Sequence, residues 1–327
     1  MKKYTFLLFV IASLALQGCM YQQAESIANK DIDPKLREII KAKNDSLFNA
    51  LSNSSSKVLE KLGSPKFVKF MHSRLEGVIW PFRKGYLTTD YVVYDEFYNH
   101  HSTVPDNSVI AAPQKGYTFT FQNQQKETYV SLLKCTYQDM EDYVVAVIYS
   151  NINGEWKIEE IKAGQLGIYG KTPNDLYNEA QQLNEKGFSI DAISHIDAAN
   201  SFLDPLENML KYDEDKRIRY YQKDWAEKLN STVILPYELR EIHSKPVIGG
   251  ITSVKNTEGF YPLINYITIV PVQDTLALGR EFERVKAETE KAFPQIDFKQ
   301  KYIYYRAYNK DPETDILNKN YTFTVKK

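Results

Sequence analysis

The histidines are the first residues to test for chemistry, because a neutral imidazole binds metals and accepts protons near neutral pH. The chain has five, and His100-His101 is their only cluster. Adjacent residues of an extended chain point in opposite directions, and a metal site needs further ligands at suitable spacing. Asp95 and Glu96 are near in sequence but are thin support. We therefore predict no metal and no cofactor, and an exposed histidine pair in a loop.

Signatures of common enzyme classes are missing from the sequence. It contains no P-loop, glycine-rich dinucleotide fingerprint, Gly-x-Ser-x-Gly elbow or His-Glu-x-x-His. Of the two cysteines, Cys135 lies in the strand-like run 129–137. No neighbouring histidine or Lys/Arg cluster favours its thiolate. We predict that Cys135 is buried as a small hydrophobic residue.

The other cysteine, Cys19, ends a segment that indicates where the protein works. A short basic start precedes an apolar run, 4–16, that is too short to span a membrane. The sequence Leu16-Gln17-Gly18-Cys19 follows and resembles the lipobox of bacterial lipoproteins, with Gln17 where a smaller residue is commoner. The resemblance implies removal of residues 1–18 as a signal peptide and acylation of Cys19. Met20, rather than Asp, favours the outer membrane. The alternative is an ordinary signal peptide that happens to contain a cysteine.

The bulk composition is that of a multidomain globular protein. The chain has 327 residues, of which 43% are hydrophobic and 25% are charged. A net charge of −1 provides no basic field to hold nucleic acid or anionic lipid. Tyrosine is abundant at 24 residues. Tyrosine-rich strands explain this most simply, and a carbohydrate or protein surface is the alternative.

Residues 34–170 follow a polar tether, 19–33, and combine helices with a sheet. Helical spacing begins at Pro34 with Asp33 as a plausible N-cap, and shorter helical pieces follow up to about residue 75. We interpret 106–116 as a turn-rich loop. The strand-like segments predict an antiparallel meander; they are 91–98, 117–121, 127–137, 143–149 and 155–161.

Helices followed by a long meander that ends in Asn-Gly154-Glu-Trp156-Lys-Ile158 resemble the nuclear-transport-factor-two-like (cystatin-like) superfamily of α+β cones. The resemblance covers about residues 35–165 and implies that Trp156 packs under the curved sheet. Another α+β domain with a meander is the alternative. Some enzymes of this superfamily use an Asp–His pair inside the cone for proton abstraction. On this chain the resemblance makes Asp95 and His100, with Tyr94, speculative pocket residues. A general base must reach its substrate proton, and we predict no catalytic residue.

Residues 171–231 return to helical spacing. Two helices separated by a glycine turn at Gly187 resemble one tetratricopeptide repeat, without a second copy. One further helix, or a broken pair, follows. Its Lys216-Arg-Ile-Arg219 run is interpreted as a solvated face. We expect residues 232–327 to form a second α+β unit of the order β-α-β-β, with 246–259 as a loop and a helix over 274–293.

These observations predict an α+β protein with N-terminal helices, a curved antiparallel meander, a central helical hairpin and a small C-terminal β-α-β-β unit. The expected function is a lipid-anchored, non-catalytic binding or assembly module of the cell envelope, with an envelope protein as possible partner and an unknown ligand. A cone-fold dehydratase, isomerase or hydrolase is one alternative. A carbohydrate-associated accessory protein is another.

Overall fold

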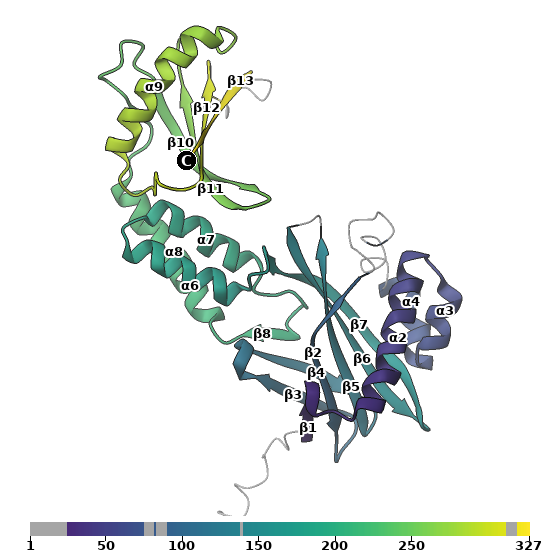
Figure 1. Cartoon of the computed structure of the whole chain (residues 1–327). Coiled ribbons are helices and arrows are strands. Elements are labelled where there is room, and N and C mark those ends of the chain that lie inside the picture. Colours follow the sequence, from purple (N-terminus) through teal and green to yellow (C-terminus); the bar gives the residue numbers. More distant parts are fainter. Residues whose placement is uncertain (1–24, 75–81, 83–89, 138–139, 312–318) are drawn as a thin grey trace, which may run out of the picture.

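The chain folds as the α+β protein that its sequence predicts (Figure 1). The computed structural model describes residues 25–74, 82, 90–137, 140–311 and 319–327. The predicted signal segment and Cys19 lie outside the described residues. None of the described helices is long and apolar enough to cross a membrane.

Sheet A is the antiparallel meander of the first module, with an extra strand at one edge. Its strands are, in spatial order, β1 (Glu25–Ala28), β2 (Val92–His100), β5 (Glu127–Tyr137), β6 (Glu141–Ile152) and β7 (Glu155–Ile168). Strand β1 pairs with β2, a short helix η1 (Asn29–Asp31) follows, and Ile32 is buried. Residues 25–33 therefore belong to the folded module, although the sequence predicted them to be part of a tether.

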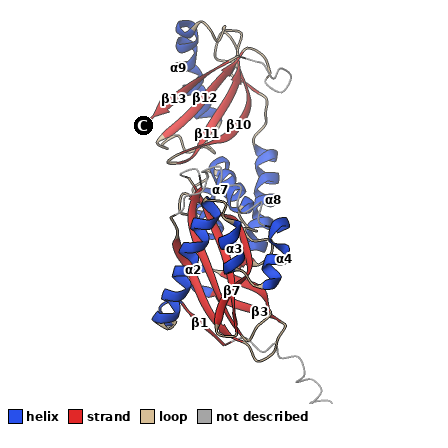
Figure 2. Cartoon of the chain, turned by 90° about the vertical axis from the view of Figure 1, so that its right-hand side faces the viewer, coloured by secondary structure: helices blue, strands red, loops and turns tan. Residues whose placement is uncertain are grey.

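Three helices cover one face of sheet A: α2 (Pro34–Ser52), α3 (Ser56–Leu62) and α4 (Pro65–Arg74) (Figure 2). Asp33 caps α2, because its Oδ1 accepts a hydrogen bond from the Lys35 amide at 2.7 Å. The apolar side of α2 buries Leu47 and Phe48 against the sheet. We call this the helix-side core.

Sheet B covers the opposite face and consists of β3 (Asp106–Ala112), β4 (Tyr117–Asn123) and β8 (Leu210–Tyr212). The prediction of a loop over 106–116 was wrong, because 106–112 is a strand. The short helix η2 (Pro113–Lys115) and the left-handed Gly116 make the turn into β4. Buried Ser108 and Ile110 alternate with exposed Val109, as in a strand. The turn-forming residues at both ends of this segment made a loop the simpler prediction. Strand β4 therefore pairs within sheet B and not within the meander.

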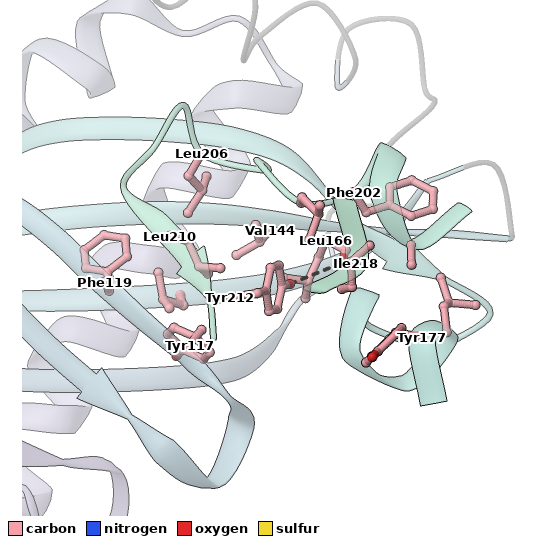
Figure 3. Packing of buried hydrophobic residues seen from close by; sticks show 14 of the residues in the cluster. Tyr117, Phe119, Val144, Leu166, Tyr177, Phe202, Leu206, Leu210, Tyr212 and Ile218 are labelled. Atoms are coloured by element: carbon pink, nitrogen blue, oxygen red, sulfur yellow. Dashed lines mark hydrogen bonds between the residues drawn. The ribbon is translucent and has the colours of Figure 1, made fainter. Parts of the chain in front are cut away.

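The helices α6 (Pro173–Glu185), α7 (Ser189–Ser201) and α8 (Asp215–Thr232) share the core between sheets A and B. A capping box of Thr172 and Asp175 starts α6. Figure 3 shows Leu166 of β7, Tyr117 of β4 and Tyr212 of β8 in one cluster with Tyr177 and Ile218 of the helices. We call this cluster the inter-sheet core. The predicted boundary near residue 170 does not separate two hydrophobic cores.

Sheet C forms the C-terminal unit with its own core. Its spatial order is β13 (Asn320–Lys326), β12 (Tyr302–Tyr308), β11 (Gly259–Ile267), β10 (Val247–Asn256) and β9 (Tyr237–Glu238), and α9 (Thr275–Ala292) covers one face. The prediction of a loop over 246–259 was wrong. Its two adjacent glycines lie at a register shift between Ile248 and Gly250, which is a common place for glycine within a strand. The unit therefore begins with a hairpin, and α9 connects the parallel strands β11 and β12.

Candidate ligand-binding site

Asp95, a speculative pocket residue from the sequence, is buried between sheets A and B. Its carboxylate accepts hydrogen bonds from Asn29 Nδ2 at 2.9 Å and from the Tyr117 hydroxyl at 2.5 Å. Lys115 Nζ lies 3.0 Å from Oδ1. Burial and the neighbouring Asp95 raise the pKa of Tyr117 far above its ordinary value, so Tyr117 keeps the proton that it donates. This carboxylate is compensated and enclosed, which makes its role structural.

Glu96 is equally buried but serves the other face of sheet A. Its carboxylate pairs with Arg37 Nε of α2 and accepts a hydrogen bond from the Tyr129 hydroxyl at 2.6 Å. The register shifts between Val93 and Asp95, which leaves a β-bulge at Tyr94. Since consecutive strand residues point to opposite faces, the two adjacent acids each neutralise a cation in a different core.

His100 does not meet Asp95. It is exposed at the end of β2. Alternation along the strand places it on the same face as Glu96 and Tyr98, opposite to Asp95. Tyr94 instead packs on Tyr117, with a ring separation of 6.2 Å. The structure therefore does not bring together the Asp–His pair that the cone resemblance suggested.

His101 corrects the expectation of an exposed histidine pair, because it is only 4% exposed. Its Nε2 lies 2.8 Å from Thr128 Oγ1, and its Nδ1 lies 3.2 Å from Ser108 Oγ. A serine beside a histidine can be a nucleophile with its base. Ser108 is also only 4% exposed and donates to Asn123 Oδ1 at 3.4 Å. Because both side chains are enclosed between strands, this network is structural.

The helix-side core is filled with aromatic side chains. Tyr129 and Tyr149 of sheet A are fully buried, and Phe48 of α2 is 1% exposed. Trp156 packs in the same core, with its ring centroid 6.3 Å from those of Tyr98 and Tyr129. Tyr149 donates to Asn44 Oδ1 at 2.8 Å, so even the hydroxyl is used internally. Among the described residues, these side chains fill the space between the helices and sheet A.

Metal and thiol chemistry have little support in the part of the chain that the structure describes. No group of three or more His, Cys, Asp and Glu residues is placed there to hold a metal ion. Cys135 is 3% exposed, which confirms the sequence prediction. Burial raises the pKa of its thiol to about 12, so the nucleophilic thiolate is disfavoured.

A cavity of about 510 Å³ lies between the α7–α8 helices and the β10–β11 hairpin of sheet C. Its volume is within the roughly 300–1,000 Å³ of typical small-molecule sites. Most of its wall is apolar. The apolar residues in this wall come from β7, α7, α8 and its following loop, and sheet C; they include Ile168, Ile190, Ile193, Phe202, Leu229, Val233, Leu235, Ile251 and Phe260. We call it the interdomain cavity.

Hydrogen bonds hold the two walls of this cavity together. The Tyr169 hydroxyl donates to the carbonyl oxygens of Asn256 (2.7 Å) and Gly259 (3.2 Å), at the tip of the β10–β11 hairpin. At the start of α7, Asp191 Oδ2 accepts a hydrogen bond from the Asp297 amide at 2.7 Å. The Ile190 amide donates to the Gln295 carbonyl at 3.2 Å. These contacts fix the two walls relative to each other.

The polar groups of the interdomain cavity favour binding over catalysis. Its charged side chains are Asp197 and Lys255. Asp197 Oδ1 accepts a hydrogen bond from Gln222 Nε2 at 2.9 Å, and Lys255 Nζ lies 3.5 Å from Glu141 Oε1. Both are therefore engaged by residues outside the wall. The wall also contains uncharged polar residues, which are Ser194, Ser201, Asn230, Thr252 and Ser253. A mainly apolar wall with polar groups can enclose the apolar body of a ligand and orient its polar end.

A scan against protein-family models, a search of curated proteins and a search of solved structures found no match to this chain. The resemblances to bacterial lipoproteins, to the cone superfamily and to a tetratricopeptide repeat therefore stay predictions.

Sequence reasoning did not find the interdomain cavity. Its wall combines α7, which was predicted, with strand β10, which was interpreted as a loop. One signal was present in the sequence: α7 has more apolar residues than a helical hairpin can bury. Ile190 is one of them, and it packs in the core of sheet C rather than between sheets A and B.

Proposed function

We propose that this protein is a lipid-anchored, non-catalytic binding protein of the bacterial cell envelope, and that its ligand occupies the interdomain cavity. The observation that carries the proposal is this apolar cavity of about 510 Å³ between two units that hydrogen bonds already hold in place. Its wall suits a small molecule with an apolar body and few polar groups. Acylation of Cys19, supported by the lipobox, keeps the binding module at the membrane, with the outer membrane favoured.

The cavity is tested by titrating the purified protein with 1-anilinonaphthalene-8-sulfonate, a fluorescent probe of apolar sites. Ala198 lies in the wall, so Ala198→Trp fills the space with an indole. We expect saturable fluorescence with the native chain and at least tenfold weaker binding with Ala198→Trp.

Lys223→Trp is the matched control, because Lys223 is on the exposed side of α8 and its side chain is 78% exposed. It should bind the probe as the native chain does. Equal binding by the native chain and Ala198→Trp, with both folded by circular dichroism, overturns the assignment of the cavity.

The anchor and a protein partner are tested together by affinity purification from solubilised envelopes. The full chain should fractionate with membranes, and Cys19→Ser should be released. A stoichiometric partner that survives washing with the lipidated protein adds an assembly role. Membrane retention of Cys19→Ser contradicts the lipid anchor.

A further inference from the structure

Sheet C has one face that no described helix or strand covers. The side chains of Tyr266, Ile303 and Tyr305 point to α9 and form the C-terminal core. Because strand residues alternate, their neighbours in sequence point to the opposite side. Figure 2 looks onto that side, with α9 behind the strands. We call it the open face of sheet C.

Tyrosines form a ladder across this open face. Tyr302 and Tyr304 are both on β12, with ring centroids 6.2 Å apart and planes at 22°. Tyr261 of β11 meets Tyr302 edge to face at 5.1 Å. Asn256 Nδ2 donates to the Tyr304 hydroxyl at 3.0 Å. All three tyrosines are half-buried, so the rings are held in position while part of each stays accessible.

Cations border the ladder. Lys326 pairs across from Tyr302, and its Nζ lies 5.9 Å from the ring centroid. Arg306 follows Tyr304 on the same face and donates from Nε to Thr322 Oγ1 at 3.2 Å. Among the residues that the structure describes, Arg306 forms no ion pair, whereas Lys326 lies close enough to Glu258 to help lower the pKa of that carboxyl. Glu258, at one end of the ladder, pairs with Lys301 and accepts a hydrogen bond from the Tyr302 hydroxyl at 3.3 Å.

We propose that the open face of sheet C binds an acidic polysaccharide. The negative face of a tyrosine ring attracts the slightly positive C–H groups on the flat side of a pyranose. A ladder of two or three rings therefore matches consecutive sugars. Arg306 and Lys326 lie beside the ladder, where they pair with the carboxylates of uronic acid units. Asn265 and Thr324, from the same face, offer hydrogen bonds to sugar hydroxyls.

The face is less suited to other classes of partner. Two of its apolar residues, Leu263 and Tyr308, are only 6% and 8% exposed, and Val254 and Ile267 are half-buried, so limited apolar surface is left for the core of a protein interface. A nucleic acid has one phosphate per nucleotide and needs an extended basic field, whereas this chain has a net charge of −1. A polyuronate has one carboxylate per sugar, a lower charge density than the one charge per ~1.7 Å of double-stranded nucleic acid, and Arg306 and Lys326 suit it.

The test is isothermal titration of the detergent-purified full chain with galacturonic acid oligomers, with neutral dextran oligomers as the comparison ligand. We expect the acidic oligomer to bind and the dextran to bind at least tenfold more weakly. Tyr302→Ala should weaken binding at least tenfold. Arg306→Gln should weaken it about tenfold and reduce its dependence on salt.

Tyr321→Ala is the matched control. Tyr321 pairs with Ala307 on the α9 side of the same sheet and is 37% exposed, so its removal should leave binding unchanged. Tyr302→Phe keeps the ring and should retain binding, which separates loss of stacking from loss of fold. Equal binding of dextran, preferential binding of a poly-uridine oligomer, or no effect of Arg306→Gln each overturns the proposal. Ala198→Trp should not affect it, so the cavity and this face fail independently.

Discussion

At the scale of residues, the buried polar groups of strand β2 are structural. Asp95 and Glu96 are adjacent in sequence and lie on opposite faces of sheet A. Each forms an ion pair and accepts a hydrogen bond from a tyrosine hydroxyl. The sequence alone does not decide whether a carboxylate near a histidine in sequence is structural or catalytic. The bonding partners decide it, because a fully compensated acid within a core stabilises the fold and has no access to a substrate.

Replacing Asp95 by alanine should destabilise the protein without touching the interdomain cavity. The change leaves Lys115, Tyr117 and Asn29 without their acceptor, so we expect the free energy of unfolding to fall by about 2–4 kcal/mol. Urea denaturation followed by circular dichroism measures it. His100→Ala is the control, since His100 is exposed, and should change stability by less than ~0.5 kcal/mol. A larger effect of His100→Ala contradicts the assignment.

Cys135 should not react in the folded protein. Its burial and its raised pKa of about 12 predict negligible labelling by a thiol reagent at pH 8, and rapid labelling in denaturant. The measurement uses the Cys19→Ser chain, so that Cys135 is the single thiol. Stoichiometric labelling under native conditions would show that sheet A opens at β5.

At the scale of elements, the docking of sheet C against α7 determines the candidate site. Tyr169 holds the β10–β11 hairpin tip, and Asp191 binds the backbone at Asp297. Asp191 is 4% exposed in a helix that packs on both units. A buried carboxyl at this position makes the stability of the folded protein depend on pH.

The stability of the folded protein should fall as the pH rises through 6. Burial raises the pKa of Asp191 from 3.8 to about 6, so between these values the folded state holds a proton that the unfolded state has lost. This contribution is fully present below pH 3.8 and is lost above pH 6, with a size of roughly 3 kcal/mol.

Thermal denaturation of the native chain and of Asp191→Asn between pH 4 and 7 measures this contribution. Burial lowers the pKa of His195, which changes stability in the opposite direction, so the difference between the two proteins is the informative quantity. Asn keeps an acceptor for the Asp297 amide, and its profile should lack the decline. Parallel profiles contradict the prediction.

At the scale of the whole molecule, the described residues bury three hydrophobic cores, and the inter-sheet core joins the first two predicted modules. Strand β8, from the helical region, pairs with β4. Figure 1 shows α6, α7 and α8 between sheet C and the two other sheets. The described residues of 25–231 therefore share two connected cores, and sheet C packs mainly in a third.

Truncated chains test whether the first predicted module can fold without the helices of the central region. A chain that ends at residue 170 loses the helices that cover Val144, Leu166 and Ile168, so it should aggregate, as size-exclusion chromatography will show. A chain that ends at residue 231 keeps the inter-sheet core and should remain a soluble monomer with one unfolding transition. A stable, monomeric chain ending at 170 would show that the first module folds by itself.

The sequence by itself determined the α+β class, the N-cap at Asp33, the burial of Cys135 and the helices of the central region, because these depend on local spacing and capping. The tertiary structure decided the pairing of β4 with β3 and β8, the separation of Asp95 from His100, and the cavity between α7 and β10. Each of these depends on which distant segment covers a given face. Alternation and helical spacing predict that a residue is buried, but they do not name the residue that it meets.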